Sequence, residues 1–264
     1  MSELKAYTGK QLQTAIEMLQ AFTPGADAEI IHQLRVSLKK IKAVLVFLST
    51  LHPEKAKKIR KKVQVVFRAA GSVREAQLQL QWLRKKRYVH LIEAAQLEQK
   101  ISEDEALLQL HKEHYQDLLA SVAEDLRKLV RKVKQERVTD YAEKLKETLQ
   151  QQLQHAVKEE WHALRKLIKQ MLYAHHWLSE QEKLKIMPVL SYHVFDQLQE
   201  QIGAWHDMVD LQQWLTDQQF FLQHEPSVKQ QGTKASAQLQ TTLLLQEQAV
   251  LRQLLAIKKP VKQN

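Results

Sequence analysis

Four basic side chains share one face of a predicted helix near the start of the 264-residue sequence: His32, Arg35, Lys39 and Lys42. Successive residues of an α-helix turn by about 100°, so residues three, seven and ten or eleven positions apart return to one side. Arg can form two parallel hydrogen bonds to phosphate oxygens, and Lys supplies a mobile point charge. A row of cations on a rigid helix therefore predicts a partner that carries many negative charges in a line.

An apolar stripe runs along a different side of the same segment. It consists of Leu34, Leu38, Ile41 and Leu45. We expect these residues to hold the helix against a core, so that the cations lose little entropy when they bind an anion. The alternative interpretation of the basic row is an ordinary helix face that is exposed to solvent.

A second basic face follows 130 residues after the first. His162, Arg165 and Lys169 repeat the spacing, and Tyr173 extends it. After each copy come a proline (Pro53, Pro188) and then a glycine, and these two glycines lie 132 residues apart, at positions 71 and 203. Because the chain has only 5 Gly, two of them in register indicate an internal duplication. We place its seam between residues 135 and 140, with halves of 1–137 and 138–264.

The elements that must position these faces are predicted to be helices. Leu, Gln, Lys, Glu and Ala dominate the sequence, which has only 5 Gly and 5 Pro. These residues are the ones that lose least when they enter a helix. Blocks of alternating β-branched and aromatic residues, which are typical of strands, are missing. The sequence therefore predicts an all-α protein.

Start and stop signals predict where the helices begin and end. Asp27 is the expected N-cap of the helix that carries the first face, and Gly71 is the expected stop of the third helix. Capping boxes are expected to open helices at Ser102 and Ser179. The helices are expected at about 8–21, 28–51, 54–70, 73–88 and 102–135, then 140–179 as one helix or two, one ending at 203, 205–223, and, after a loop at 226–232, one ending near 257.

Composition excludes several classes of protein. The chain has no Cys, which excludes disulfides, thiolate metal sites and Cys nucleophiles. It lacks a secretory signal pattern and any apolar run of the roughly 18–20 residues that span a bilayer, so we expect a soluble, cytoplasmic protein. The net charge is +10, and basic runs at 55–62 and 84–87 add to it. At this level phosphate polymers, nucleic acids and anionic membranes all fit as partners.

Four segments together resemble the motifs of the CHAD family, the conserved-histidine α-helical domains. Segment 31–42 resembles the first motif, which has a His, then Leu-Arg, then a ladder of Arg or Lys. Segment 161–173 is similar to the second copy, including the Tyr that follows the ladder. Segments 71–75 and 203–207 are similar to the family's Gly-x-x-[Arg/Asn]-Asp turns. The resemblance covers nearly the whole chain, with all four motifs in order.

The resemblance implies two pseudo-symmetric four-helix bundles that enclose a basic central groove or pore. It also implies binding of inorganic polyphosphate, without catalysis, cofactor or metal, in a protein that could associate with polyphosphate granules. The residues that would contact the anion are His32, Arg35, Lys39, Lys40, Lys42, His162, Arg165, Lys166 and Lys169. The residues that would support or orient them are Arg74, Glu75, Tyr173, His206 and Asp207.

The sequence departs from the family pattern mainly in its second half. Gln170 and Leu172 stand where the second ladder usually continues with basic residues. His206 replaces the Arg or Asn of the second turn, and Glu75 replaces the Asp of the first. We therefore expect the first half to bind the anion more strongly.

Several of these residues have a second interpretation. His32 and His162 border apolar positions and could be core histidines. Glu75 and Asp207 are expected to cap helices or to orient nearby cations, with metal binding as the alternative. The pairs His111–His114 and His175–His176 could also hold a structural metal.

Two other functions compete with polyphosphate binding. A nucleic-acid-binding protein would use the same cations and could stack bases on the 5 Trp and 6 Tyr. A metal-dependent phosphohydrolase would use the His and acidic residues. No Gly-rich phosphate loop and no Gly-x-Ser-x-Gly turn are present in the sequence, so an enzyme has little support. No membrane is expected as a partner, and the oligomeric state is left open.

Overall fold

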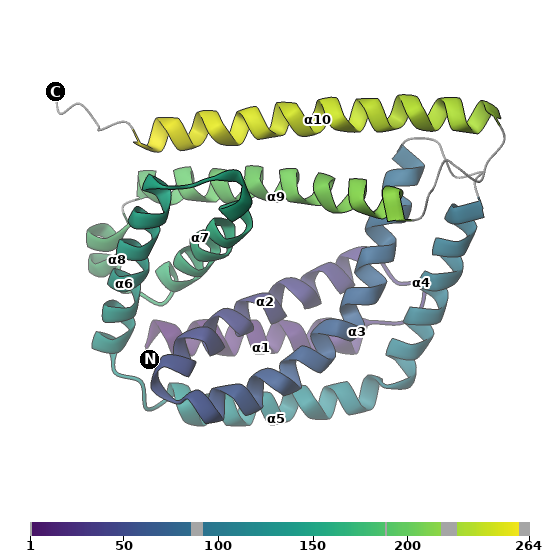
Figure 1. The fold of residues 1–264 in the computed structure, drawn as a ribbon. Helices are drawn as coiled ribbons and strands as arrows, with labels where there is room; N and C mark the ends of the chain where they lie inside the picture. The colour runs from purple at the N-terminus through teal and green to yellow at the C-terminus, as the bar shows by residue number, and fades with distance from the viewer. Residues whose placement is uncertain (1, 86–91, 188, 218–225, 259–264) are drawn as a thin grey trace. The chain divides into compact units, whose positions relative to one another are not determined.

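The computed structural model describes residues 2–85, 92–187, 189–217 and 226–258 (Figure 1). These residues form ten α-helices and one short 3-10 helix, with no strand among them. The all-α prediction is confirmed. The elements are α1 (Glu3–Ala21), α2 (Ala28–Leu51), α3 (Pro53–Lys85), α4 (Ile92–Leu110), α5 (Lys112–Val130), α6 (Gln135–Gln154), η1 (Lys158–Glu160), α7 (Trp161–His175), α8 (Glu180–Ile186), α9 (Val189–Asp217) and α10 (Pro226–Lys258).

The chain divides into two compact units. Unit 1 consists of Met1–Val138 with His176–Ser179, and unit 2 consists of Thr139–His175 with Glu180–Asn264. Each unit contains one of the two basic helix faces, on α2 and on α7 respectively.

Unit 1 is built around the helices α1, α2, α3 and α5. Helix α1 packs against α2 and α5, and α3 packs against the same two helices, so the four enclose one core (Figure 1). Helix α4 packs on α3. Trp177 from the segment His176–Ser179 is fully buried in this unit, with its ring centroid 5.7 Å from that of Phe47.

Helix α2 forms as the sequence predicts. The Asp27 carboxylate caps its N-terminus by accepting a hydrogen bond of 2.9 Å from the Glu29 backbone N–H. The apolar stripe is buried to the last residue, because Leu34, Leu38, Ile41 and Leu45 are each at most 1% exposed. The helix ends at Leu51, and Pro53 opens α3 with a backbone angle that suits a first helical turn.

Unit 2 contains α6 from Thr139 onward and α7 to α10, with α9 packed against both α7 and α10 (Figure 1). Trp161 at the start of α7 is buried, and its ring meets that of Trp205 on α9 edge to face at 5.0 Å. The segment 140–179 is not one helix: α6 ends at Gln154, and the short η1 precedes α7.

Neither glycine of the repeated motif ends a helix. The prediction that Gly71 stops the third helix is wrong, because α3 continues through it to Lys85. Gly203 likewise lies inside α9 and not at a helix end. A glycine that ends a helix usually does so in the left-handed conformation, and among the described glycines only Gly25 has a positive φ, of 77°. Gly71 and Gly203 instead allow a side chain to approach the helix closely.

Other predicted boundaries were also wrong. Ser102 lies inside α4, so the first capping box opens no helix, and its Glu105 instead accepts a hydrogen bond of 2.8 Å from the Gly25 backbone N–H. The stretch expected at 102–135 is divided at His111, between α4 and α5, and α6 begins at Gln135 and not near 140.

The last helices differ from expectation as well. Helix α9 covers the two helices expected on either side of residue 203, and α10 begins at Pro226, where a loop was expected. The second capping box agrees with the structure, since α8 begins at Glu180, directly after Ser179. The expected helix ends at 88 and 223, and Pro188, lie outside the described residues. No helix in the described part of the chain combines the length and apolar character needed to cross a membrane.

Candidate functional site

The basic face of α2 gathers around one aromatic ring of α3. The Arg35 Nη1 donates a hydrogen bond of 3.1 Å to the Phe67 carbonyl oxygen, and its guanidinium carbon lies 4.4 Å from the Phe67 ring centroid. The Lys42 Nζ lies 4.2 Å from the same centroid and donates to the Gln64 side-chain oxygen at 3.0 Å. Cations over the face of an aromatic ring are attracted by its quadrupole. Phe67 therefore fixes both cations in place.

Gly71 makes the position of Arg35 possible. A Cβ atom at residue 71 would lie only 2.6 Å from the Arg35 Nη1, closer than real Cβ contacts allow. In a helix, the side chain of residue i+4 lies near the carbonyl of residue i. Gly71 therefore leaves the Phe67 carbonyl open to the guanidinium.

Unit 1 carries excess positive charge at this face. The pKa of Arg35 is lowered, first by burial and then by the charge of Arg74, and Glu75 opposes this shift. The pKa of His32 is also lowered, mainly by burial and next by Arg74, with smaller contributions from Lys39 and Arg35, while Glu29 opposes the shift. His32 is half-buried, so it is not a core histidine. The cations destabilise each other's charged forms, which is the condition under which an added anion is favourable.

The structure separates Lys40 from this group. Burial lowers the pKa of Lys40, and the next cause is Lys10 of α1. Lys40 therefore belongs to the surroundings of α1, whereas Lys39 is exposed and its charge acts on His32.

Unit 2 repeats the arginine contact. The Arg165 Nε donates a hydrogen bond of 3.2 Å to the Gln199 carbonyl oxygen, four residues before Gly203. A Cβ at residue 203 would lie 2.6 Å from the Arg165 Nη2 and 2.9 Å from both Nε and the guanidinium carbon. The contact between an α2 or α7 arginine and the carbonyl four residues before a glycine is thus present in both units.

The remaining predicted residues of unit 2 form two smaller groups. His162 lies against His206, with ring centroids 4.3 Å apart, and the pKa of His162 is lowered first by burial and then by Lys166. The Lys169 Nζ lies 5.7 Å from the Tyr173 ring centroid. Burial raises the pKa of Tyr173 to about 12, so its hydroxyl stays protonated at neutral pH.

The two positions at which the second ladder departs from the pattern serve the packing of unit 2. Gln170 donates a hydrogen bond of 3.0 Å to the Tyr141 hydroxyl on α6. Leu172 is only 4% exposed. A lysine in place of Leu172 would have to place its charge in the interior of the unit, and a lysine in place of Gln170 would lose the hydrogen bond to Tyr141.

Glu75 and Asp207 do not cap helices. Both lie in the middle of long helices, α3 and α9, and both are exposed. The charge of Glu75 opposes the lowering of the pKa of Arg35. Asp207 belongs instead to a group with His206 and Asp210, whose potential metal-ligand atoms all lie within 4.8 Å of one another. The pairs His111–His114 and His175–His176 are not part of any such group in the described ranges.

Sequence reasoning missed Phe67, Gln64 and Asp210. The first two could have been found from spacing, since they precede Gly71 by one and nearly two helical turns and so share its face. Asp210 could have been found as the residue one turn after His206. The basic run 55–62 is mostly exposed on α3, although the Lys62 Nζ pairs with the Asp125 carboxylate at 2.8 Å. Of the run 84–87, Lys86 and Arg87 lie outside the described residues.

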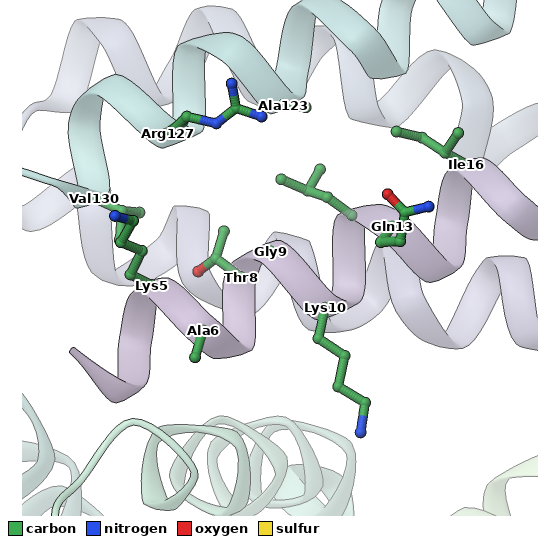
Figure 2. A pocket seen from close by; sticks show the side chains of 11 residues that line it. Lys5, Ala6, Thr8, Gly9, Lys10, Gln13, Ile16, Ala123, Arg127 and Val130 are labelled. Atoms are coloured by element: carbon green, nitrogen blue, oxygen red, sulfur yellow. The ribbon is translucent and has the colours of Figure 1, made fainter. Parts of the chain in front are cut away.

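A cavity of about 340 Å³ lies between α1 and α5 in unit 1. Figure 2 shows Lys5 on α1 and Arg127 on α5 at its border. None of the predicted site residues lines it. It is therefore a feature separate from the basic faces.

Comparisons with known proteins agree with this architecture. The sequence model of the CHAD domain matches residues 10–216. The fold is similar to the crystal structure of the CHAD domain from the plant Ricinus communis, with a TM-score of 0.68 and 17% sequence identity over 96% of this chain and 91% of that chain. At this identity the likeness establishes the fold alone. No curated protein gives a significant match to the sequence.

Proposed function

The chain belongs to the CHAD domain family, and we propose that it binds inorganic polyphosphate through its two basic helix faces without hydrolysing it. The observation that supports this proposal most is the repeated arginine contact. In each unit a guanidinium is fixed beside a glycine of the facing helix, with a His about one turn before it and a Lys about one turn after it. Such a face is arranged before the ligand arrives.

The fixed arginines still have donors to offer. A guanidinium has five N–H groups in a planar fork. Arg35 uses Nη1 for the Phe67 carbonyl, and Arg165 uses Nε for the Gln199 carbonyl. The other N–H groups can bind phosphate oxygens, and the nearby lysines supply further charge. In this proposal the contacts are those predicted from sequence, with Lys40 as the peripheral member.

The electrostatics of unit 1 favour an anion. Burial and then the charge of Arg74 lower the pKa of both His32 and Arg35, so in the free protein Arg74 opposes a positive charge on either group by repulsion. A phosphate oxygen placed among them would remove this repulsion. Linear polyphosphate presents about one negative charge per phosphate. It has no bases for a protein to recognise, so a track of cations is sufficient to bind it.

Titration with long-chain polyphosphate at moderate salt tests this proposal. We expect saturable binding by calorimetry and no release of inorganic phosphate, with or without added Mg²⁺. Absence of saturable binding would overturn the proposal, and metal-dependent phosphate release would establish a hydrolase instead.

Competition with RNA distinguishes the other candidate function. Base stacking needs accessible aromatic rings, whereas Trp161, Trp177 and Trp205 are at most 9% exposed and the other two Trp residues, Trp82 and Trp214, are half-buried. We therefore expect RNA of matched charge to displace polyphosphate poorly. Displacement at equal charge concentration would favour a nucleic-acid-binding protein.

A further inference from the structure

Helix α9 carries three potential metal ligands on adjoining turns. His206, Asp207 and Asp210 each offer one ligand atom, and these atoms all lie within 4.8 Å of one another. The His206 Nδ1 is 2.9 Å from the Asp210 Oδ2, a spacing of four residues on one helix face. Ligands about 2.1 Å from a tetrahedral Zn²⁺ lie about 3.4 Å apart. Small side-chain rotations are therefore enough to bring the three atoms onto one ion.

A histidine of another helix packs against the imidazole of this cluster. The His162 ring of α7 packs on the His206 ring, with centroids 4.3 Å apart and planes inclined by 33°. The His162 Nδ1 is buried and has no hydrogen-bond partner among the described residues. Buried polar atoms are rarely left unpaired without a reason. The contact also restricts the orientation of the His206 imidazole.

Unit 1 provides an internal contrast at the corresponding positions. Counted from the repeated glycine, His206 corresponds to Arg74, and Asp210 corresponds to Leu78. A cation and a leucine cannot hold a metal ion. The three-residue cluster is therefore a property of unit 2. Asp207 has an acidic counterpart in Glu75, which acts on Arg35, whereas Asp210 has none and would repel a polyanion.

The nearby charges and the exposure permit an ion to enter. The His206 side chain is 25% exposed and that of Asp210 is 66% exposed. Lys166 and Arg165 are cations that act on the neighbouring His162. The two carboxylates offset these two positive charges, so a divalent ion does not meet a net repulsive site.

We propose that His206, Asp207 and Asp210 form a binding site for a divalent transition-metal ion of the Zn²⁺ class, with the His162 ring packed against its imidazole ligand. One imidazole and two carboxylates make a nitrogen–oxygen ligand set that suits Zn²⁺ and its neighbours better than Ca²⁺ or Mg²⁺, which prefer oxygen alone. The solvent-exposed side of the cluster leaves positions for water or for a phosphate oxygen.

Calorimetric titration of the full chain with Zn²⁺, without any polyphosphate, tests this site. Visible absorption of the Co²⁺-loaded protein reports the coordination. We expect saturable binding of one ion, and we expect His206→Ala or Asp210→Asn to weaken it at least about 10-fold. Loss of a residue that only hydrogen-bonds to a metal ligand already weakens metal affinity by about 10-fold or more, and loss of a ligand should cost no less. His193→Ala removes an exposed histidine from the same helix, outside the cluster, and should leave the affinity unchanged.

Two outcomes would overturn the proposal. One is the absence of saturable Zn²⁺ binding to the wild-type protein. The other is equal Zn²⁺ affinity in wild type and in Asp210→Asn, a variant that changes one exposed charge and should fold, as far-UV circular dichroism can verify. Because polyphosphate is absent from the titration, this result is independent of whether the chain binds polyphosphate.

Discussion

Arg35 and Arg165 each cover a helix carbonyl that a glycine leaves open. The arginine thereby ties two helices of its own unit together and is held in one orientation. Its side-chain entropy is lost on folding and not on binding, which favours affinity. At the scale of single residues, the glycine thus determines the position of the proposed anion contact without touching the anion itself.

Alanine substitutions at three glycines test this link. Gly9 lies in α1 with nothing within 4 Å of an added Cβ, so Gly9→Ala should raise the free energy of unfolding by up to about 1 kcal/mol. Gly71→Ala displaces only the tip of Arg35. Its gain in helix propensity roughly offsets a lost hydrogen bond of about 1 kcal/mol, but polyphosphate affinity should fall. Gly203→Ala displaces the whole Arg165 head group and should destabilise unit 2 by about 1–2 kcal/mol.

Chemical denaturation and polyphosphate titration of the three variants give the comparison. Gly9→Ala is the matched control, because it makes the same change at a helical position where an added Cβ meets no atom within 4 Å. If Gly71→Ala bound polyphosphate as tightly as Gly9→Ala, the position of Arg35 would not matter for binding.

His32 should make polyphosphate binding depend on pH. Its pKa in the free protein lies below the usual value, mainly through burial and then through Arg74. A bound anion favours the protonated form and raises this pKa, so binding takes up a proton. Affinity should therefore rise as pH falls from about 7.5 to about 5.5, by at most about 10-fold per pH unit for one proton. His32→Gln should flatten the profile measured at constant ionic strength, and an unchanged profile would exclude His32 from the site.

At the scale of elements, the cap that the sequence predicts for α2 is present in the structure, whereas the cap predicted at Ser102 lies inside α4. Asp27→Ala removes the hydrogen bond to the Glu29 N–H and should lower the free energy of unfolding by about 1 kcal/mol. Ser102→Ala changes an exposed residue inside α4 and should have no destabilising effect, since alanine is the better helix former. Equal losses in thermal denaturation would mean that Ser102 caps a helix after all.

The two basic helices should contribute unequally to binding. Arg35→Ala with Lys39→Ala should weaken polyphosphate binding more than Arg165→Ala with Lys169→Ala. The reason is that α2 keeps Lys42 over the Phe67 ring, whereas Leu172 of α7 is buried and Gln170 is bonded to Tyr141. Lys132→Ala with Lys134→Ala, which removes two exposed charges from the turn after α5, controls for net charge. Equal losses in the two ladder variants would contradict this asymmetry.

The sequence predicts the helices with strong apolar periodicity better than it predicts their ends. Helix α2 was placed correctly because Asp27, the Leu34 to Leu45 stripe and His52–Pro53 all favour the same boundaries. The predicted helix end at Gly71 is wrong because glycine is favoured in two different places. It is favoured at the end of a helix and also where another side chain approaches the helix closely. The difference is decided by the Arg35 contact across two helices, which local sequence does not contain.

For the candidate site too, the sequence predicts neighbours on one helix but not contacts between helices. Spacing on one helix identifies His32, Arg35 and Lys42 as neighbours, and the structure keeps them together. It also assigns Lys40 to a different environment beside Lys10. That environment depends on how α1 packs on α2, and a single helix pattern says nothing about the neighbouring helix.

At the scale of the whole molecule, salt dependence separates a specific track of cations from the general effect of a +10 charge. Seven of the proposed contacts are Arg or Lys. For a flexible polyanion each neutralised charge contributes about −0.7 to the slope of log affinity against log salt. If all seven touch the polymer, raising NaCl from about 50 to about 200 mM should weaken binding by about 10³-fold. Calorimetry or a competition assay over this range measures the slope, and the Lys132→Ala with Lys134→Ala variant should leave it unchanged. A slope that corresponds to only one or two charges would mean that the polymer contacts a small part of one basic face and not the two tracks that we propose.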